Sequence, residues 1–79
     1  MFTIYTKEAC NYCNMAKAEM DRLGIKYEIV EQSKQSSLDL SSRLDSNMFL
    51  YPQIFDHNDS LIGGFEALLD YTDIESAPI

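Results

Sequence analysis

Two cysteines separated by two residues are the feature of this sequence most suited to chemistry. They form the segment Cys10-Asn11-Tyr12-Cys13, and the 79 residues contain no other cysteine. Thiol–disulfide exchange needs one cysteine that is largely thiolate near neutral pH and a second sulfur within reach. A Cys-x-x-Cys pair at the start of a helix meets both needs. The spacing therefore predicts a redox-active pair.

The two cysteines are expected to have different roles. Cys10 should lie at the first turn of a helix, where unpaired N–H groups and the positive end of the helix dipole stabilise a thiolate. Lys7, three residues upstream, can add a local positive charge. Cys13 falls one turn further in, on the same face, and should be less exposed. We therefore expect Cys10 to be the nucleophile and Cys13 the resolving thiol.

Other roles for the cysteines fit the sequence less well. A structural zinc site usually has four Cys or His ligands, whereas this chain has two Cys and one His. The histidine, His57, lies far along the chain in a predicted turn. A structural disulfide across two residues would close a tiny loop and stabilise little. Two inert cysteines would not explain the spacing at a helix start. We expect no metal.

Hydrophobic patterns predict the elements that position this pair. A first strand covers residues 2–5, and a helix runs from after Asn11 to about Leu23 with a buried stripe. A second strand covers residues 25–31, and Ser36 with Asp39 resembles the start of a second helix. Two short runs, 53–55 and 61–62, form a hairpin, and a last helix runs from Phe65 to Tyr71 or Thr72. The buried stripe of the first helix comprises Cys13, Ala16, Met20 and Leu23, and the second helix should bury Leu40, Leu44 and Met48.

The resulting order, β-α-β-α-β-β-α, predicts one α/β domain over residues 1–79. The first two strands, joined by a helix, should be parallel through a right-handed crossover, and the closing hairpin should be antiparallel. A mixed four-stranded sheet flanked by three helices is the thioredoxin fold in its minimal form. The tail to Ile79 is expected to be frayed.

Charge and composition narrow the function further. The formal net charge is -7, and the six basic residues are scattered between Lys7 and Arg43. This excludes an extended nucleic-acid surface, which needs clustered Lys and Arg. No apolar run reaches the length of a membrane span, and the N-terminus lacks a signal-like segment. We expect a cytoplasmic monomer, in a compartment where thiols are normally reduced.

Three segments in order resemble the glutaredoxin family over nearly the full length. They are Lys7-Glu8-Ala9-Cys10-Asn11-Tyr12-Cys13, Tyr51-Pro52-Gln53-Ile54-Phe55 and Ile62-Gly63-Gly64-Phe65. The resemblance implies a glutathione–disulfide oxidoreductase with glutathione as co-substrate. Its clients would be glutathione mixed disulfides and disulfide-containing proteins, ribonucleotide reductase among them.

The resemblance also implies how glutathione would be held beside the cysteines. Lys7 would lie close to the thiolate and a glutathione carboxylate, and Tyr12 would line the same groove. Tyr51, before a cis Pro52, would offer its backbone N–H and C=O to the cysteinyl part of glutathione. Tyr51 is bulkier than the valine that is often found there, so it would narrow the groove or stack on the substrate.

The double glycine is implied to form the other end of the glutathione site. The turn at Gly63-Gly64 would expose N–H groups at a helix N-terminus, an anion-binding arrangement, and Phe65 and Glu66 match positions that hold the γ-glutamyl carboxylate. Ala67 stands where the family favours Asp, so a partner of the glutathione α-amino group is missing. Glu66 would then replace this partner or repel the carboxylate.

Two alternative functions stay open. Asn11 stands where the family usually has proline, and some relatives without that proline bind a bridging iron–sulfur cluster together with glutathione. The chain could therefore carry such a cluster in a dimer through Cys10. Glutaredoxin-like proteins reduced by thioredoxin reductase share the fold and the cysteine pair, but they usually lack the double glycine.

Overall fold

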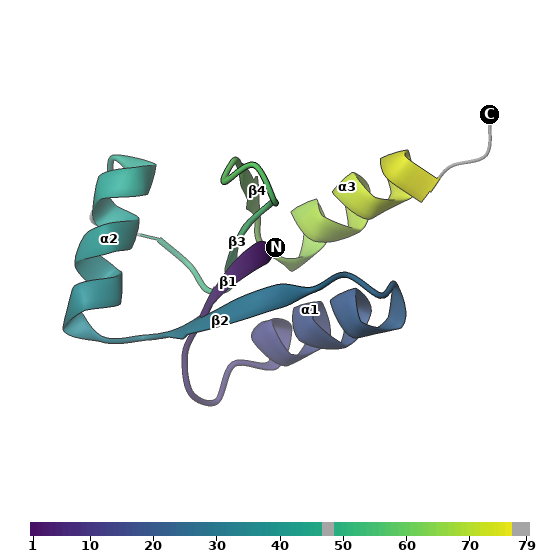
Figure 1. Cartoon of the computed structure of the whole chain (residues 1–79). Coiled ribbons are helices and arrows are strands. Elements are labelled where there is room, and N and C mark those ends of the chain that lie inside the picture. The colour runs from purple at the N-terminus through teal and green to yellow at the C-terminus, as the bar shows by residue number, and fades with distance from the viewer. Residues whose placement is uncertain (47–48, 77–79) are drawn as a thin grey trace.

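The computed structural model describes residues 1–46 and 49–76, and its elements follow the predicted order β-α-β-α-β-β-α. The strands are β1 (Phe2–Thr6), β2 (Tyr27–Glu31), β3 (Gln53–Phe55) and β4 (Leu61–Gly63); the helices are α1 (Asn11–Arg22), α2 (Lys34–Leu44) and α3 (Phe65–Ser76). The sheet has the order β2-β1-β3-β4 (Figure 1). Strands β1 and β2 are parallel, whereas β1–β3 and β3–β4 are antiparallel. This is the predicted thioredoxin-like fold.

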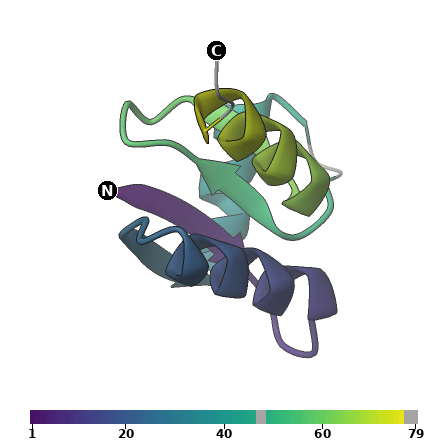
Figure 2. The same cartoon turned by 90° about the vertical axis from the view of Figure 1, so that its right-hand side faces the viewer.

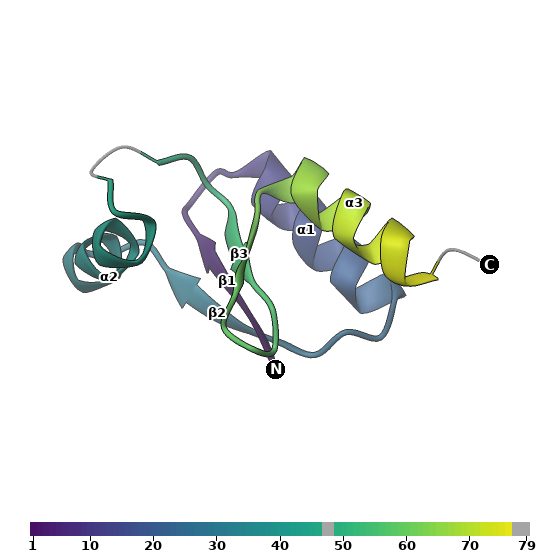
Figure 3. The ribbon, with the colours of Figure 1, turned by 90° about the horizontal axis from the view of Figure 1, so that it is seen from above.

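Helices cover both faces of the sheet. Helices α1 and α3 lie side by side on one face, and α2 lies on the other (Figures 2 and 3). Successive residues of a strand point to opposite faces, so Ile4 of β1 packs with α1 and α3 while its neighbour Tyr5 packs with α2. The first core cluster contains Phe2, Ile4, Ala16, Met20, Ile54 and Leu68, and the second contains Tyr5, Leu40 and Phe55.

Polar contacts attach α2 to its face of the sheet. The hydroxyl of Tyr5 donates a hydrogen bond to the Asp39 carboxylate. The Arg43 guanidinium lies 4.7 Å from the centre of the Phe55 ring and donates a hydrogen bond of 2.8 Å to Asp59 in the β3–β4 turn. Burial, followed by the hydrogen bond to Asp39, raises the pKa of Tyr5 to about 12.

Two helix boundaries differ from the prediction. Helix α2 begins at Lys34, and its N-cap is Ser33, three residues before the predicted Ser36. The Ser33 hydroxyl accepts from the Ser36 N–H, and the Ser36 hydroxyl accepts from the Ser33 N–H, so the two serines form a reciprocal cap. Helix α3 continues to Ser76 rather than ending at Tyr71 or Thr72. No glycine or proline interrupts the chain between Phe65 and Ser76.

The predicted buried faces are largely found. Cys13, Ala16 and Met20 of α1 are buried, but Leu23 is exposed because it caps the end of the helix. In α2, Leu40 is buried and Leu44 packs against the second cluster. Met48 and the end of the predicted tail, residues 77–79, lie outside the described residues. None of the helices described is both long and apolar enough to cross a membrane.

Candidate active site

The two cysteines lie where β1 leads into α1. Cys10 is the N-cap of α1, with an extended backbone, and its Sγ accepts a hydrogen bond of 3.1 Å from the Cys13 N–H. The preceding residue, Ala9, has a left-handed φ of 52°, which turns the chain sharply into the helix. Cys10 and Cys13 form a disulfide, and their Cα atoms are 5.2 Å apart. Cys10 is 7% exposed and Cys13 only 1%, so the more buried sulfur lies one turn inside the helix.

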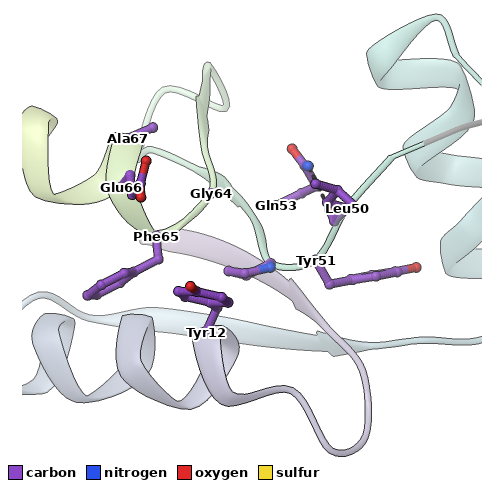
Figure 4. Close-up of a pocket in the computed structure, with 9 residues that line it drawn as sticks. Tyr12, Leu50, Tyr51, Gln53, Gly64, Phe65, Glu66 and Ala67 are labelled. Carbon is purple, nitrogen blue, oxygen red and sulfur yellow. Dashed lines mark hydrogen bonds between the residues drawn. The ribbon is translucent and has the colours of Figure 1, made fainter.

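A groove of about 400 Å³ lies between the N-terminus of α1, the segment before β3 and the start of α3 (Figure 4). Six of the predicted binding residues line it together, although they come from three separate parts of the chain. The nine lining residues are Tyr12, Leu50, Tyr51, Pro52, Gln53, Gly64, Phe65, Glu66 and Ala67. The rings of Tyr12 and Phe65 approach each other with centroids 6.2 Å apart, which links α1 to α3 at one end of the groove.

The segment before β3 lines the groove with Leu50, Tyr51 and Pro52. The Tyr51–Pro52 peptide bond is cis, as predicted. The Tyr51 side chain points away from Tyr12 and Phe65, toward α2, and its ring packs edge-on against Phe49 at 5.7 Å (Figure 4). Within the described residues its buried hydroxyl has no hydrogen-bond partner. The Tyr51 ring is thus directed away from the two aromatic rings at the far end of the groove.

Lys7 is the one predicted binding residue that does not line the groove. It lines a separate polar hollow of similar volume with Thr6, Glu8, Lys17, Glu31 and Gln32. Its Nζ lies 6.0 Å from the centre of the Tyr51 ring. Lys7 is therefore near the Tyr51 ring but is not among the residues that line the groove.

The double glycine joins β4 to α3 at the edge of the groove. Gly63 has a φ of 122°, and a Cβ there would lie 2.9 Å from the Ala67 Cβ. A Cβ on Gly64 would lie 3.6 Å from the Pro52 carbonyl oxygen, so the two backbones approach closely. Leu68 N–H donates to the Gly64 carbonyl, which makes Gly64 the residue before the first helical turn. Gly64 has no side chain that could cap the first N–H groups of α3, and among the described residues no other side chain accepts a hydrogen bond from them.

Three lining residues were not predicted to bind: Leu50, Gln53 and Ala67. The side chain of Gln53 donates a hydrogen bond of 2.7 Å to the Leu50 carbonyl and so braces the turn before the cis-proline. Leu50 is a neighbour of the predicted Tyr51–Pro52 segment, which was the available signal. Within residues that the structure describes, no three Cys, His, Asp or Glu side chains are grouped as they would be to hold a metal ion.

Comparison with known proteins places the chain in a family. The family model for glutaredoxins matches residues 2–62, which is more than half of the chain. The chain belongs to the glutaredoxin family. It is therefore a glutaredoxin-like thiol–disulfide oxidoreductase with a Cys-x-x-Cys active-site pair.

Solved glutaredoxin structures have the same fold along nearly the whole chain. Glutaredoxin 1 from Francisella tularensis, complexed with cacodylate, is 25% identical, with a TM-score of 0.76 over 94% of this chain and 93% of that one. Glutaredoxin from Brucella melitensis is 29% identical, with a TM-score of 0.70 over 95% and 84%. A buckwheat glutaredoxin–glutathione complex is 22% identical, with a TM-score of 0.75 over 94% and 69%. No curated protein matches the sequence significantly.

Proposed function

We propose that this glutaredoxin reduces protein disulfides and glutathione mixed disulfides, with Cys10 as the nucleophile, Cys13 as the resolving thiol and glutathione as the reductant. The observation that carries the proposal is the groove, which joins a cis-proline segment and the start of α3 to Tyr12, the residue that precedes Cys13 in the cysteine motif. The buckwheat relative, whose fold this chain shares, is a complex with glutathione.

The backbone favours Cys10 as the attacking group. In the reduced protein, the Cys13 N–H that now meets the Cys10 sulfur would donate to the thiolate, and the helix dipole adds to this. Cys13 lies deeper, at 1% exposure, and within bonding reach of Cys10. A client sulfur can therefore approach Cys10 first, and Cys13 can attack only after it.

Two reaction courses follow from this division. With a glutathione mixed disulfide, the Cys10 thiolate attacks the glutathionyl sulfur, and the client leaves as a thiolate. A second glutathione thiolate then attacks the glutathionyl sulfur bonded to Cys10, which releases oxidised glutathione and leaves Cys10 as a thiolate again. With a protein disulfide, the Cys10 thiolate first attacks one client sulfur, which forms a mixed disulfide and frees the other client thiolate. Cys13 then attacks the Cys10 sulfur, which forms the Cys10–Cys13 disulfide and releases the second client thiol. Two glutathione molecules then reduce the protein.

The groove offers complementary groups to an extended thiol peptide. The Tyr51 backbone can pair with the cysteinyl part of glutathione, and the free N–H groups of Phe65 and its neighbours can hold the γ-glutamyl carboxylate. The Glu66 carboxylate suits the α-ammonium group at the same end of glutathione. Tyr12 forms the wall of the groove that α1 contributes. Lys7 lies outside the groove, with its Nζ 6.0 Å from the centre of the Tyr51 ring, and adds positive charge near this segment.

Trapping the glutathionylated protein tests this proposal. Cys13→Ser incubated with oxidised glutathione should gain one glutathionyl group, and peptide mapping should place it on Cys10. The matched Cys10→Ser variant should react far more slowly, because Cys13 is almost completely buried. Intact-mass spectrometry measures both. Rapid glutathionylation of the Cys10→Ser variant, with none of the Cys13→Ser variant, would contradict the assignment of Cys10 as the nucleophile.

A further inference from the structure

The charge of this chain is divided unevenly along the sequence. Residues 1–43 contain six acidic and six basic residues, whereas residues 44–79 contain seven acidic residues and no Lys or Arg. The whole net charge of -7 therefore belongs to the second segment. That segment supplies the cis-proline loop and the start of α3, which form most of the groove.

The charge of the groove also comes from the acidic second segment. Of the nine described residues that line it, Glu66 alone carries a charge at neutral pH. Asp70 lies one helical turn further along α3, and both side chains are exposed. The three ion pairs among the described residues join Arg22 to Glu19 and Arg43 to Asp39 and Asp59, so Glu66 and Asp70 are not neutralised.

Two exposed apolar side chains also line the groove, away from the acidic residues of α3. Tyr12 of α1 is 58% exposed, and Leu50, before the cis-proline, is 82% exposed. Exposed apolar groups that flank a groove are typical of surfaces that bind a partner. The first turn of α1 contains no acidic residue that would repel an acidic client from that side, so the negative charge lies on the α3 wall.

We propose that this groove selects client disulfides in which the cysteine is flanked by basic residues, with Glu66 and Asp70 facing the Lys or Arg and with Tyr12 and Leu50 contacting apolar parts of the segment. The inference rests on the proposed function, since it concerns the substrate of the same site. Opposite charges on the two partners accelerate encounter, and the effect weakens as salt screens it.

Single-turnover kinetics with two peptides tests the inference. Each substrate is a disulfide-linked dimer of one short peptide, and the two differ only in having Lys or Glu on both sides of the cysteine. The pre-reduced protein supplies both electrons from Cys10 and Cys13, so two peptide thiols are released and no glutathione is needed. At low ionic strength the Lys peptide should react roughly 10-fold faster, and the ratio should approach one near 1 M salt.

Matched variants separate the groove from the overall charge. Glu66→Gln should lower the Lys-to-Glu rate ratio about threefold, because it removes the charge within the groove. Glu28→Gln removes the same charge from β2, at the opposite edge of the sheet, and should leave the ratio nearly unchanged.

Three results would overturn the inference. They are equal rates for both peptides, an equal effect of the two variants, and rates that fall with rising protein concentration, as they would if a second copy of the chain filled the groove. Reduced protein that reacts with neither peptide would overturn the proposed function itself. The two failures are therefore distinguishable.

Discussion

The two cysteines lie one helical turn apart, and this difference in position explains how they could have different roles in the reaction. Cys10 is the N-cap residue, where the chain is still extended and the Cys13 N–H donates to the Cys10 sulfur. Cys13 belongs to the buried stripe of α1 together with Ala16 and Met20. These two positions support the proposed roles, in which Cys10 attacks as a thiolate stabilised by the helix N-terminus and Cys13 reacts after it.

Tyr5 should give the stability of the protein a pH dependence. Its folded pKa is about 12, whereas an unfolded tyrosine titrates near 10. Since the folded state keeps the proton to higher pH, the Tyr5 contribution is complete below about pH 10 and is lost as the pH rises toward 12. Urea denaturation between about pH 9 and 12 should show a loss of about 2 kcal/mol in the free energy of unfolding.

Two tyrosine variants test whether Tyr5 causes this slope, the loss of unfolding free energy with rising pH. Tyr5→Phe should remove most of it, because the buried hydroxyl that donates to Asp39 is gone. Tyr12→Phe, at an exposed position, should keep the slope. A slope that persists in Tyr5→Phe would show that other groups cause it.

At the residue scale, the sequence predicted which residues are near the cysteines better than where their side chains point. Six of the seven residues that the three motifs implied for glutathione binding line one groove, and their binding roles stay a prediction. Spacing alone could not show that the Tyr51 ring turns toward Phe49 or that Lys7 lies against that ring, outside the groove. Those directions depend on packing between segments that are distant in the sequence.

The turn between β4 and α3 is the element that shapes one end of the groove. Gly63 is held in a conformation that favours glycine, while Gly64 brings its backbone close to the carbonyl of Pro52. Two adjacent glycines thus have different tasks: the first makes the turn, and the second allows the approach to the cis-proline segment.

Alanine substitutions should separate these two tasks. Gly63→Ala should lower the free energy of unfolding by about 2 kcal/mol, because φ is unfavourable and the new Cβ would lie 2.9 Å from the Ala67 Cβ. Gly64→Ala should lower it by less than about 1 kcal/mol, since its Cβ would make an ordinary contact of 3.6 Å. Urea denaturation of both variants measures this. Equal losses would contradict the assignment.

Helix boundaries show where local sequence signals are ambiguous. Several serines lie near the start of α2, and Ser33 and Ser36 can both act as an N-cap by residue type. The structure uses both, because each hydroxyl accepts from the N–H of the other. The prediction chose Ser36 because Asp39 follows three residues later, and this placed the N-cap three residues too late. Element type was predictable because hydrophobic periodicity extends over many residues.

At the scale of the whole molecule, the fold brings an almost neutral segment and a strongly acidic one together at the cysteines. The first 43 residues provide Cys10 and α1, and the acidic segment provides the groove wall opposite them. The charge division was visible in the sequence. That it lies along one wall of a groove follows only from the sheet order, which places β3 next to β1.

The central claim is that glutathione reduces this protein, and a coupled assay tests it most directly. NADPH consumption is measured with a glutathione mixed-disulfide substrate, supplied either with glutathione and glutathione reductase or with thioredoxin reductase alone. We predict turnover only in the glutathione system and none for Cys10→Ser in either. Turnover with thioredoxin reductase alone would contradict the claim, and would leave Gly63 and Gly64 with a purely structural role.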